Sequence, residues 1–107
     1  MILVIIESPF AGDTRRNIEY ARLCVLDSLV RGEAPICSHL LYPQVLDDNL
    51  FAERAVGIAA GLAWLSHADK HVFYTDYGMS SGMYAAWQES VKQGFSDKIE
   101  KRTLGVV

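Results

Sequence analysis

The sequence lacks the features that mark membrane proteins and nucleic-acid-binding proteins. No apolar run approaches the roughly 18 residues of a membrane span, and Glu7 ends the aliphatic stretch at residues 2–6. That stretch has neither a basic start nor a small-residue cleavage site, which favours a buried strand over a signal sequence. The net charge is −3 at pH 7, so no basic excess indicates nucleic-acid binding. We expect neither a membrane nor a nucleic acid as a partner.

Cysteine is also scarce, and its positions exclude the common zinc motifs. Cys24 and Cys37 are the only thiols, with neither CxxC spacing nor a nearby pair of histidines. Two buried, reduced thiols are the simplest interpretation, and they favour the cytoplasm. His67, Asp69 and His71 alternate, but no third ligand is apparent beside them. We therefore predict no metal site, and no cofactor is expected.

What the chain does have is a core. Half of its 107 residues are hydrophobic, and no repeat or linker divides it, so residues 1–107 are expected to form a single domain. The pattern predicts strands at residues 2–6, 35–38, 71–75 and 98–104, and helices at 14–30, 51–65 and 79–93. This alternation predicts an α/β fold: a three-layer, open, mostly parallel sheet of four to five strands with helices on both faces.

The pattern also places individual segments within that fold. Residues 2–6 are unbroken aliphatic, as in a central strand, and the alternating charges of 98–104 suit an edge strand. Apolar positions three or four residues apart predict the inward faces of the three helices. These positions are Ile18, Ala21, Val25 and Leu29 in the first helix, Ala52, Ala55, Ile58, Ala59 and Leu62 in the second, and Met83, Ala86, Trp87 and Val91 in the third.

Polar residues follow three of the predicted strands. Right-handed crossovers bring the carboxyl ends of these strands to one rim, where open α/β sheets bind ligands. The three clusters there are Glu7-Ser8-Pro9-Phe10, Ser38-His39 with Tyr42, and Asp76 with Gly78, Ser80 and Ser81. Ser80 or Ser81 can cap the third helix, whose free N–H groups favour an anion, often a phosphate. The sequence therefore predicts a small-molecule site at this rim.

Two carboxylates and a histidine in these clusters are the candidate catalytic residues. Glu7 can accept ligand hydroxyls or act as a base or nucleophile, or it is a solvated or helix-capping carboxylate. Asp76 can hold a ribose diol, or it closes an Asx-turn on its own backbone. His39 can exchange a proton near neutral pH, or it donates a structural hydrogen bond. Phe10 is either a stacking platform for a flat ring or a loop aromatic that covers the core.

With these residues, the chain resembles the nucleoside 2-deoxyribosyltransferase superfamily, and most closely a group of short, uncharacterised proteins common in phage and bacterial genomes. The matching segments span nearly the whole chain: residues 7–13, Asn17, 32–35, 38–42, Glu53-Arg54 with Gly57-Ile58 and Gly61, and 74–83. The candidate ligand-binding residues in them are Ser8, Pro9, Phe10, Gly12, Asn17, Ser38, Tyr42, Gly78, Met79, Ser80, Ser81 and Gly82. The resemblance implies a flavodoxin-like parallel sheet that binds a nucleoside or nucleotide, and reaction at its N-glycosidic bond. It also implies oligomers whose neighbouring subunits help to complete a site.

The resemblance fails at one functional position. The transferases carry a nucleophilic glutamate four residues after the turn glycine, and the same count from Gly78 reaches Gly82 here. The covalent route needs a carboxylate within about 3–3.5 Å of the anomeric carbon. Either Glu7 or Asp76 takes over this role, or the pocket persists without the chemistry. Glycine at this position also leaves room for a bulkier or doubly phosphorylated ligand.

Three functional hypotheses follow. The first is a protein that binds, and by binding sequesters, a nucleotide or nucleoside-derived molecule. The second is an N-glycosidase or deoxyribosyltransferase in which Glu7 or Asp76 is the working carboxylate and His39 assists. The third is a structural oligomer with a vestigial cleft. A homo-oligomer is expected, because so short a chain leaves much apolar surface to cover.

Overall fold

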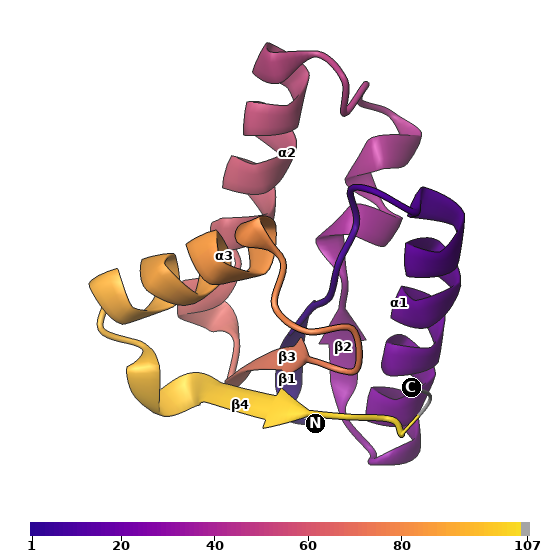
Figure 1. The fold of residues 1–107 in the computed structure, drawn as a ribbon. Coiled ribbons are helices and arrows are strands. Elements are labelled where there is room, and N and C mark those ends of the chain that lie inside the picture. The colour runs from indigo at the N-terminus through magenta and orange to yellow at the C-terminus, as the bar shows by residue number, and fades with distance from the viewer. Residues whose placement is uncertain (106–107) are drawn as a thin grey trace.

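The computed structural model describes residues 1–105 and confirms the predicted α/β fold (Figure 1). Its strands form one parallel sheet in the order β2-β1-β3-β4. The strands are β1 (Leu3–Glu7), β2 (Ala34–Ile36), β3 (Lys70–Tyr74) and β4 (Ile99–Arg102). The helices are α1 (Thr14–Val30), α2 (Phe51–Leu62) and α3 (Ser81–Lys92), and the short 3₁₀ turns include η3 (Leu65–His67). As predicted, β1 is central and β4 lies at an edge.

Alternation along the strands decides which helix covers each face of the sheet. Ile5 of β1 pairs with His71 of β3, and Glu7 pairs with Phe73, so these four side chains share one face. The opposite face, with Val4, Ile6, Val72 and Tyr74, packs against Tyr20, Ala21 and Cys24 of α1. On the first face, Phe73 packs against Met83 and Ala86 of α3, and Ile5 packs against Leu65 of η3. Helices therefore cover both faces, and the domain has three layers.

Helix α1 has the predicted bounds, and its buried face overlaps only partly with the predicted one. Its buried residues are Asn17, Tyr20, Ala21, Cys24 and Ser28. Ala21 and Val25 face the core as predicted, whereas Leu29, also predicted to point inward, is 52% exposed. Three of the five buried residues carry polar groups, and each of these has a partner: Ser28 Oγ, for example, donates to Glu33 Oε1 at 2.8 Å. A buried polar group is tolerated when it is hydrogen-bonded, so apolar spacing alone could not indicate that Asn17, Tyr20 and Ser28 are buried.

Strand β4 is tied to the rest of the sheet by a buried ion pair. The Arg102 guanidinium donates to both oxygens of Glu33, just before β2, at 2.8 and 2.7 Å. It also donates to the Tyr74 hydroxyl at 3.2 Å. Hydrogen bonds from Arg102 lower the pKa of Glu33 to about 2, against the opposing effect of burial. This pair holds an edge strand that carries little apolar surface of its own.

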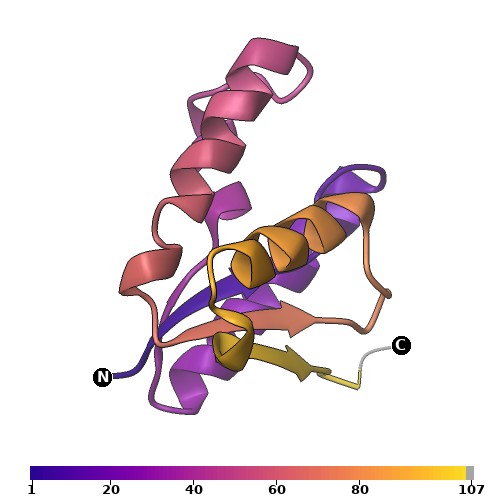
Figure 2. The same ribbon diagram turned by 90° about the vertical axis from the view of Figure 1, so that its left-hand side faces the viewer.

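Helix α2 projects away from the sheet, and Leu62 at its C-terminal end packs against the core (Figures 1 and 2). Gly61 is its only buried residue, and the predicted inward positions Ala55 and Ala59 are exposed, while Ile58 is 51% exposed. Val91 of α3, also predicted to point inward, is half exposed as well. Alanine and glycine occur on every side of α2, so the sequence does not show which side of this helix is apolar. No helix within residues 1–105 is both long enough and apolar enough to span a membrane.

Candidate functional site

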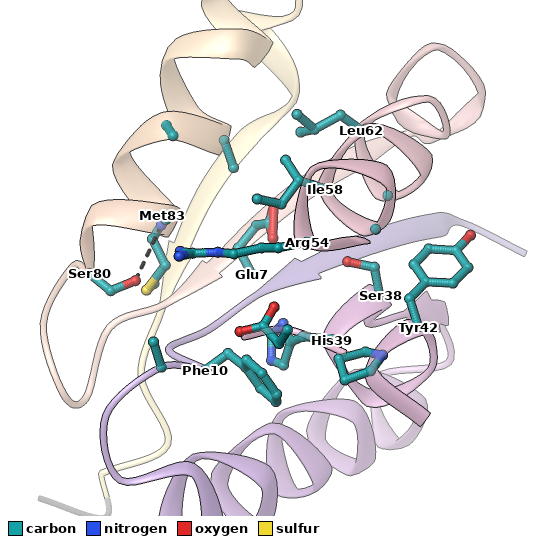
Figure 3. A pocket seen from close by; sticks show the side chains of 18 of the residues that line it. Glu7, Phe10, Ser38, His39, Tyr42, Arg54, Ile58, Leu62, Ser80 and Met83 are labelled. Atoms are coloured by element: carbon teal, nitrogen blue, oxygen red, sulfur yellow. Dashed lines mark hydrogen bonds between the residues drawn. The ribbon is translucent and has the colours of Figure 1, made fainter. Parts of the chain in front are cut away.

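A pocket of about 200 Å³ opens where β1 and β3 end, between α2 and the start of α3 (Figure 3). Its walls are mostly apolar and include Ile5, Phe10, Ile58, Leu62, Met83 and Ala86. Nine of the residues predicted for the site line it: Glu7, Ser8, Phe10, Ser38, His39, Tyr42, Ser80, Ser81 and Gly82. Residues from all three predicted clusters therefore meet at one rim.

Five of the other predicted site residues lie outside the lining and shape the loops around it. They are Pro9, Gly12, Asn17, Gly78 and Met79. Asn17 holds the loop after β1, since its Nδ2 donates to the carbonyls of Phe10 at 3.0 Å and Ala11 at 3.1 Å. Gly12 and Gly78 adopt positive φ angles of 97° and 81°, which glycine takes without strain and which turn the chain after β1 and β3.

The structure does not bring Asp76 to the pocket. Its carboxylate accepts hydrogen bonds from the Tyr20 hydroxyl at 2.5 Å and from the backbone N–H of Leu104 and Gly105 at 2.9 and 2.8 Å. Burial and this carboxylate strongly raise the pKa of Tyr20. Asp76 thus joins the loop after β3 to α1 and to the chain after β4. The structure therefore leaves Glu7 as the predicted catalytic carboxylate that borders the pocket.

Glu7 enters the pocket from the end of β1 with one oxygen already bonded. Its Oε2 lies 2.8 Å from Nε2 of His71, whose Nδ1 lies 3.0 Å from the Ser90 hydroxyl of α3. His71 is fully buried, and Ser90 is too. This is the only hydrogen bond of the Glu7 side chain within residues 1–105. Glu7 therefore caps no helix, and its Oε1 is available to a ligand.

His39 lies beside Glu7 in a smaller polar cluster. Its Nε2 is 2.9 Å from the Ser8 hydroxyl and 3.3 Å from Sγ of Cys37, and the Phe10 ring lies 5.7 Å away between centroids. Burial lowers the pKa of His39, against an opposing effect of the Glu7 charge, so the ring is neutral at pH 7. Burial also raises the pKa of Cys37. Ser8 and His39 thus offer a neutral pair of hydrogen-bonding groups.

Helix α2 contributes Arg54, which the pattern did not mark as a site residue. Figure 3 shows its side chain reaching from α2 across the pocket towards Met83. Its guanidinium makes no ion pair and no hydrogen bond with any described residue. Gly57 and Gly61, three and seven positions further on, share the lining with it. Residues three and seven positions apart lie on the same side of a helix, so this spacing could have indicated that Arg54 lies on the side of α2 that faces the pocket.

Glycines on α2 also explain how the pocket is closed on one side. A Cβ at Gly61 would lie 2.8 Å from Ser38 Oγ, and one at Gly57 would lie 3.4 Å from Leu46 Cδ1. The distance at Gly61 is too short for a side chain, so glycine at this position lets the segment after β2 approach α2 closely. The distance at Gly57 is an ordinary van der Waals contact.

The start of α3 forms the opposite wall. Ser80 is its N-cap, as predicted, and its hydroxyl accepts from the Met83 N–H at 3.2 Å. The N–H groups of Ser81 and Gly82 have no acceptor within the helix, because the first turn of a helix has none. A Cβ at Gly82 would meet only Ser80 Oγ, at 4.0 Å, so this wall has room for a ligand.

The site can therefore bind a ligand that has both polar and apolar parts. It presents the carboxylates of Glu7, Asp48 and Glu53, a cationic guanidinium, open backbone donors and neutral polar groups around an apolar centre. Among the described residues, no group of three His, Cys, Asp or Glu side chains is placed to hold a metal ion.

Comparison with known proteins gives one family and one similar fold. A solved structure of 2-deoxyribosyltransferase from the psychrotolerant bacterium Bacillus psychrosaccharolyticus superimposes with a TM-score of 0.58 over 98% of this chain and 76% of that one. The two sequences are 14% identical, so the likeness shows a shared fold. No curated protein matches the sequence. A family model described as a domain of unknown function, DUF7768, matches residues 2–99, and the chain belongs to this family.

Proposed function

We propose that this protein binds a nucleotide, or another anionic derivative of a nucleoside, in the pocket between α2 and α3. The observation that carries the proposal is the set of charged groups around an apolar pocket. Arg54 and the open N–H groups of α3 are its positive groups, and Glu7 provides a hydrogen-bond acceptor at the floor, with Asp48 and Glu53 also in the lining. A molecule with a phosphate, a sugar and a base matches these three regions.

Each part of such a ligand has a suitable partner. The phosphate binds Arg54 and the amides of Ser81 and Gly82. The sugar hydroxyls donate to Glu7, whose Oε1 is free to accept them. The base lies against the apolar wall, where Phe10 offers a ring surface. The similar fold of a 2-deoxyribosyltransferase supports a nucleoside as the core of the ligand.

Binding without turnover is favoured by the residue at position 82. A covalent transfer needs a carboxylate held against the anomeric carbon, and Gly82 supplies none. Holding a nucleotide without consuming it would sequester it. The two buried thiols suit a reducing compartment, and we place this function in the cytoplasm.

An N-glycosidase is the second candidate, and the placement of Glu7 favours it. A carboxylate anchored through one oxygen and open through the other can activate a water molecule directly. In that case the protein releases a free base from a nucleoside or nucleotide. Base release, measured by chromatography and lost in Glu7→Gln, would support this candidate over simple binding.

We also propose that the protein is a homo-oligomer assembled through α2. Phe51 is 88% exposed and Val56 59% exposed, and a groove between α2 and α3 is lined by Ala55, Ala59 and Ala63. A two-fold interface uses the same patch on both subunits, which suits a helix whose apolar residues lie on several sides. Because α2 also carries Arg54, the partner subunit would lie next to the pocket.

The test of ligand class is a calorimetric titration of deoxynucleosides, nucleoside mono-, di- and triphosphates and NAD. We expect nucleotides to bind more tightly than nucleosides. Arg54→Gln should lower nucleotide affinity roughly tenfold or more, because a hydrogen-bonded charge pair contributes about 1.5–3 kcal/mol. Nucleoside affinity should change little.

The matched control is Arg22→Gln, which removes the same charge from the exposed side of α1. It should leave nucleotide affinity unchanged. Equal binding of nucleotides and nucleosides, unaffected by Arg54→Gln, would contradict the proposed anion contact. A ligand that binds at 100 times its dissociation constant should also raise the free energy of unfolding by about 2.7 kcal/mol.

A further inference from the structure

A chain of polar side chains leads from the pocket into the core, and two of its three members, His71 and Ser90, are not part of the pocket lining. It runs from Glu7 at the end of β1, through His71 on β3, to Ser90 on α3, with contacts of 2.8 and 3.0 Å. His71 is fully buried and its ring lies 4.5 Å from that of Phe73 between centroids. Both ring nitrogens have a partner, as a buried imidazole requires.

We propose that His71 is a positioning residue that fixes the Glu7 carboxylate in the pocket. A carboxylate can only accept, so Nε2 of His71 carries the hydrogen and donates it to Oε2. The ring cannot turn away, because Ser90 on α3 holds its other nitrogen and Phe73 lies beside it. Glu7 therefore points Oε1 at the ligand in one orientation. The inference rests on the proposed function, which gives Glu7 the sugar.

The arrangement explains why a histidine occupies a strand position that would otherwise take an aliphatic residue. The register of β1 and β3 pairs His71 with Ile5, two residues before Glu7, and puts both polar side chains on the same face. His71 itself is separated from the pocket, so it does not touch the ligand. It acts through the carboxylate of Glu7.

A purely structural role is the competing explanation. The contact between His71 and Ser90 also ties β3 to α3, and its loss would loosen the core without concerning Glu7. The two roles use different ring nitrogens. Substitutions that keep one nitrogen's hydrogen bond and lose the other's can therefore separate them.

The test compares His71→Gln with His71→Asn. The longer glutamine amide reaches the place of Nε2 and keeps a donor for Glu7, whereas the asparagine amide reaches the place of Nδ1 and keeps only the bond to Ser90. We expect His71→Asn to lower nucleotide affinity about tenfold or more and His71→Gln less than about threefold. The order of the Glu7 side chain, from ¹³C relaxation of the ligand-free proteins, should fall in His71→Asn and persist in His71→Gln.

The relaxation measurement needs no ligand, so it tests the role of His71 independently of the proposed function. If no ligand binds the wild-type protein, the proposed function fails, but the order of Glu7 still decides the role of His71. Equal order and equal affinity in the two variants would overturn the inference.

Should either variant fail to fold, the wild-type protein and Glu7→Ala decide the question. The hydrogen on Nε2 of His71 should give a slowly exchanging NMR signal in the wild type and shift in Glu7→Ala. An unchanged signal would overturn the inference.

Discussion

Single residues around the pocket differ in how firmly the protein holds them. Glu7 is anchored by a buried partner, whereas Arg54 extends from α2 without a hydrogen bond to any described residue. The fixed carboxylate of Glu7 and the free guanidinium of Arg54 suit different parts of a ligand. The fixed group can define the position of a sugar, and the free one can adapt to a charged group of variable size. Gly82, also in the lining, leaves space at the start of α3.

Gly82→Glu tests that space at the residue scale. A side chain fits there, since a Cβ would meet only Ser80 Oγ at 4.0 Å. Replacing a helical glycine should raise stability by up to about 1 kcal/mol, and a carboxylate in the first turn should add about 0.3–1 kcal/mol. Nucleotide affinity, measured by calorimetry, should fall because the new charge repels a phosphate.

The control for that variant is Gly82→Gln, which fills the same space without charge. It should keep most of the stability gain and lose less nucleotide affinity. If both variants bind nucleotides as the wild type does, the phosphate does not lie at the start of α3. Release of base by Gly82→Glu alone would show that the pocket can orient a nucleoside for transfer.

Some residue assignments could be predicted from the sequence, and others could not. Glu7 and His39 follow strands, and strand ends meet at one rim, so their convergence was predictable. Asp76 also follows a strand, but its carboxylate bonds to Tyr20, 56 residues earlier, and to backbone that follows β4. No local pattern contains such a partner. The contact of His71 with Glu7 was missed for the same reason, since the two residues are 64 positions apart.

At the scale of elements, local signals predicted the bounds of helices better than their faces. Asp13 caps α1 by accepting from the Arg16 N–H at 3.2 Å, and Gly32 follows it with a φ of 82°. These signals lie within a few residues of the helix ends. The buried face of α1 depends instead on polar partners outside the helix, such as Asp76, which lies 56 residues from Tyr20. The face of α2 was not predictable because alanine and glycine occur on all its sides.

The ion pair between Arg102 of β4 and Glu33 gives a prediction for the stability of this edge strand. The pKa of Glu33 is lowered from 4.5 to about 2, so the pair's stability is present above pH 4.5 and is lost as pH falls towards 2. Thermal unfolding should show this loss in the wild type and a weaker one in Glu33→Gln. At pH 7, Glu33→Gln should lower the free energy of unfolding by about 1.5–3 kcal/mol, because Arg102 loses its two charged hydrogen bonds to Glu33 and keeps its ion pair with Glu100.

The double variant Glu33→Leu/Arg102→Met is the matched control for the ion pair. It removes both charges and should be more stable than Glu33→Gln. If Glu33→Gln unfolds at the wild-type temperature at pH 7 and keeps the same acid slope, the pair does not secure β4.

At the scale of the whole molecule, the unusual element is a helix with almost no buried residue. The rest of the domain packs in three layers, and α2 projects beyond them (Figure 2). An exposed helix of this composition gains little stability from its own sequence, since Gly57 and Gly61 weaken it. Contact with a second subunit would supply the missing burial, and would also stiffen the wall of the pocket that carries Arg54.

Ala59→Glu tests this assembly. The substitution puts a charge into the groove between α2 and α3, away from the lining of the ligand pocket. Light scattering with size-exclusion chromatography should show a dimer or larger oligomer for the wild type and a monomer for Ala59→Glu, because a charge buried in an interface is costly. Val30→Glu, at the exposed end of α1, should assemble as the wild type does. A wild-type monomer at all concentrations would contradict the assembly.

The bond between Asp76 and the segment after Arg102 has a consequence for biosynthesis. The loop that leads into α3 is held by the amides of Leu104 and Gly105, which are translated long after the loop itself. A nascent chain that already contains every residue lining the pocket still lacks these amides. The loop after β3 can therefore bond to the Tyr20 hydroxyl as soon as it is made, and it gains its bonds to Leu104 and Gly105 after β4 has been added.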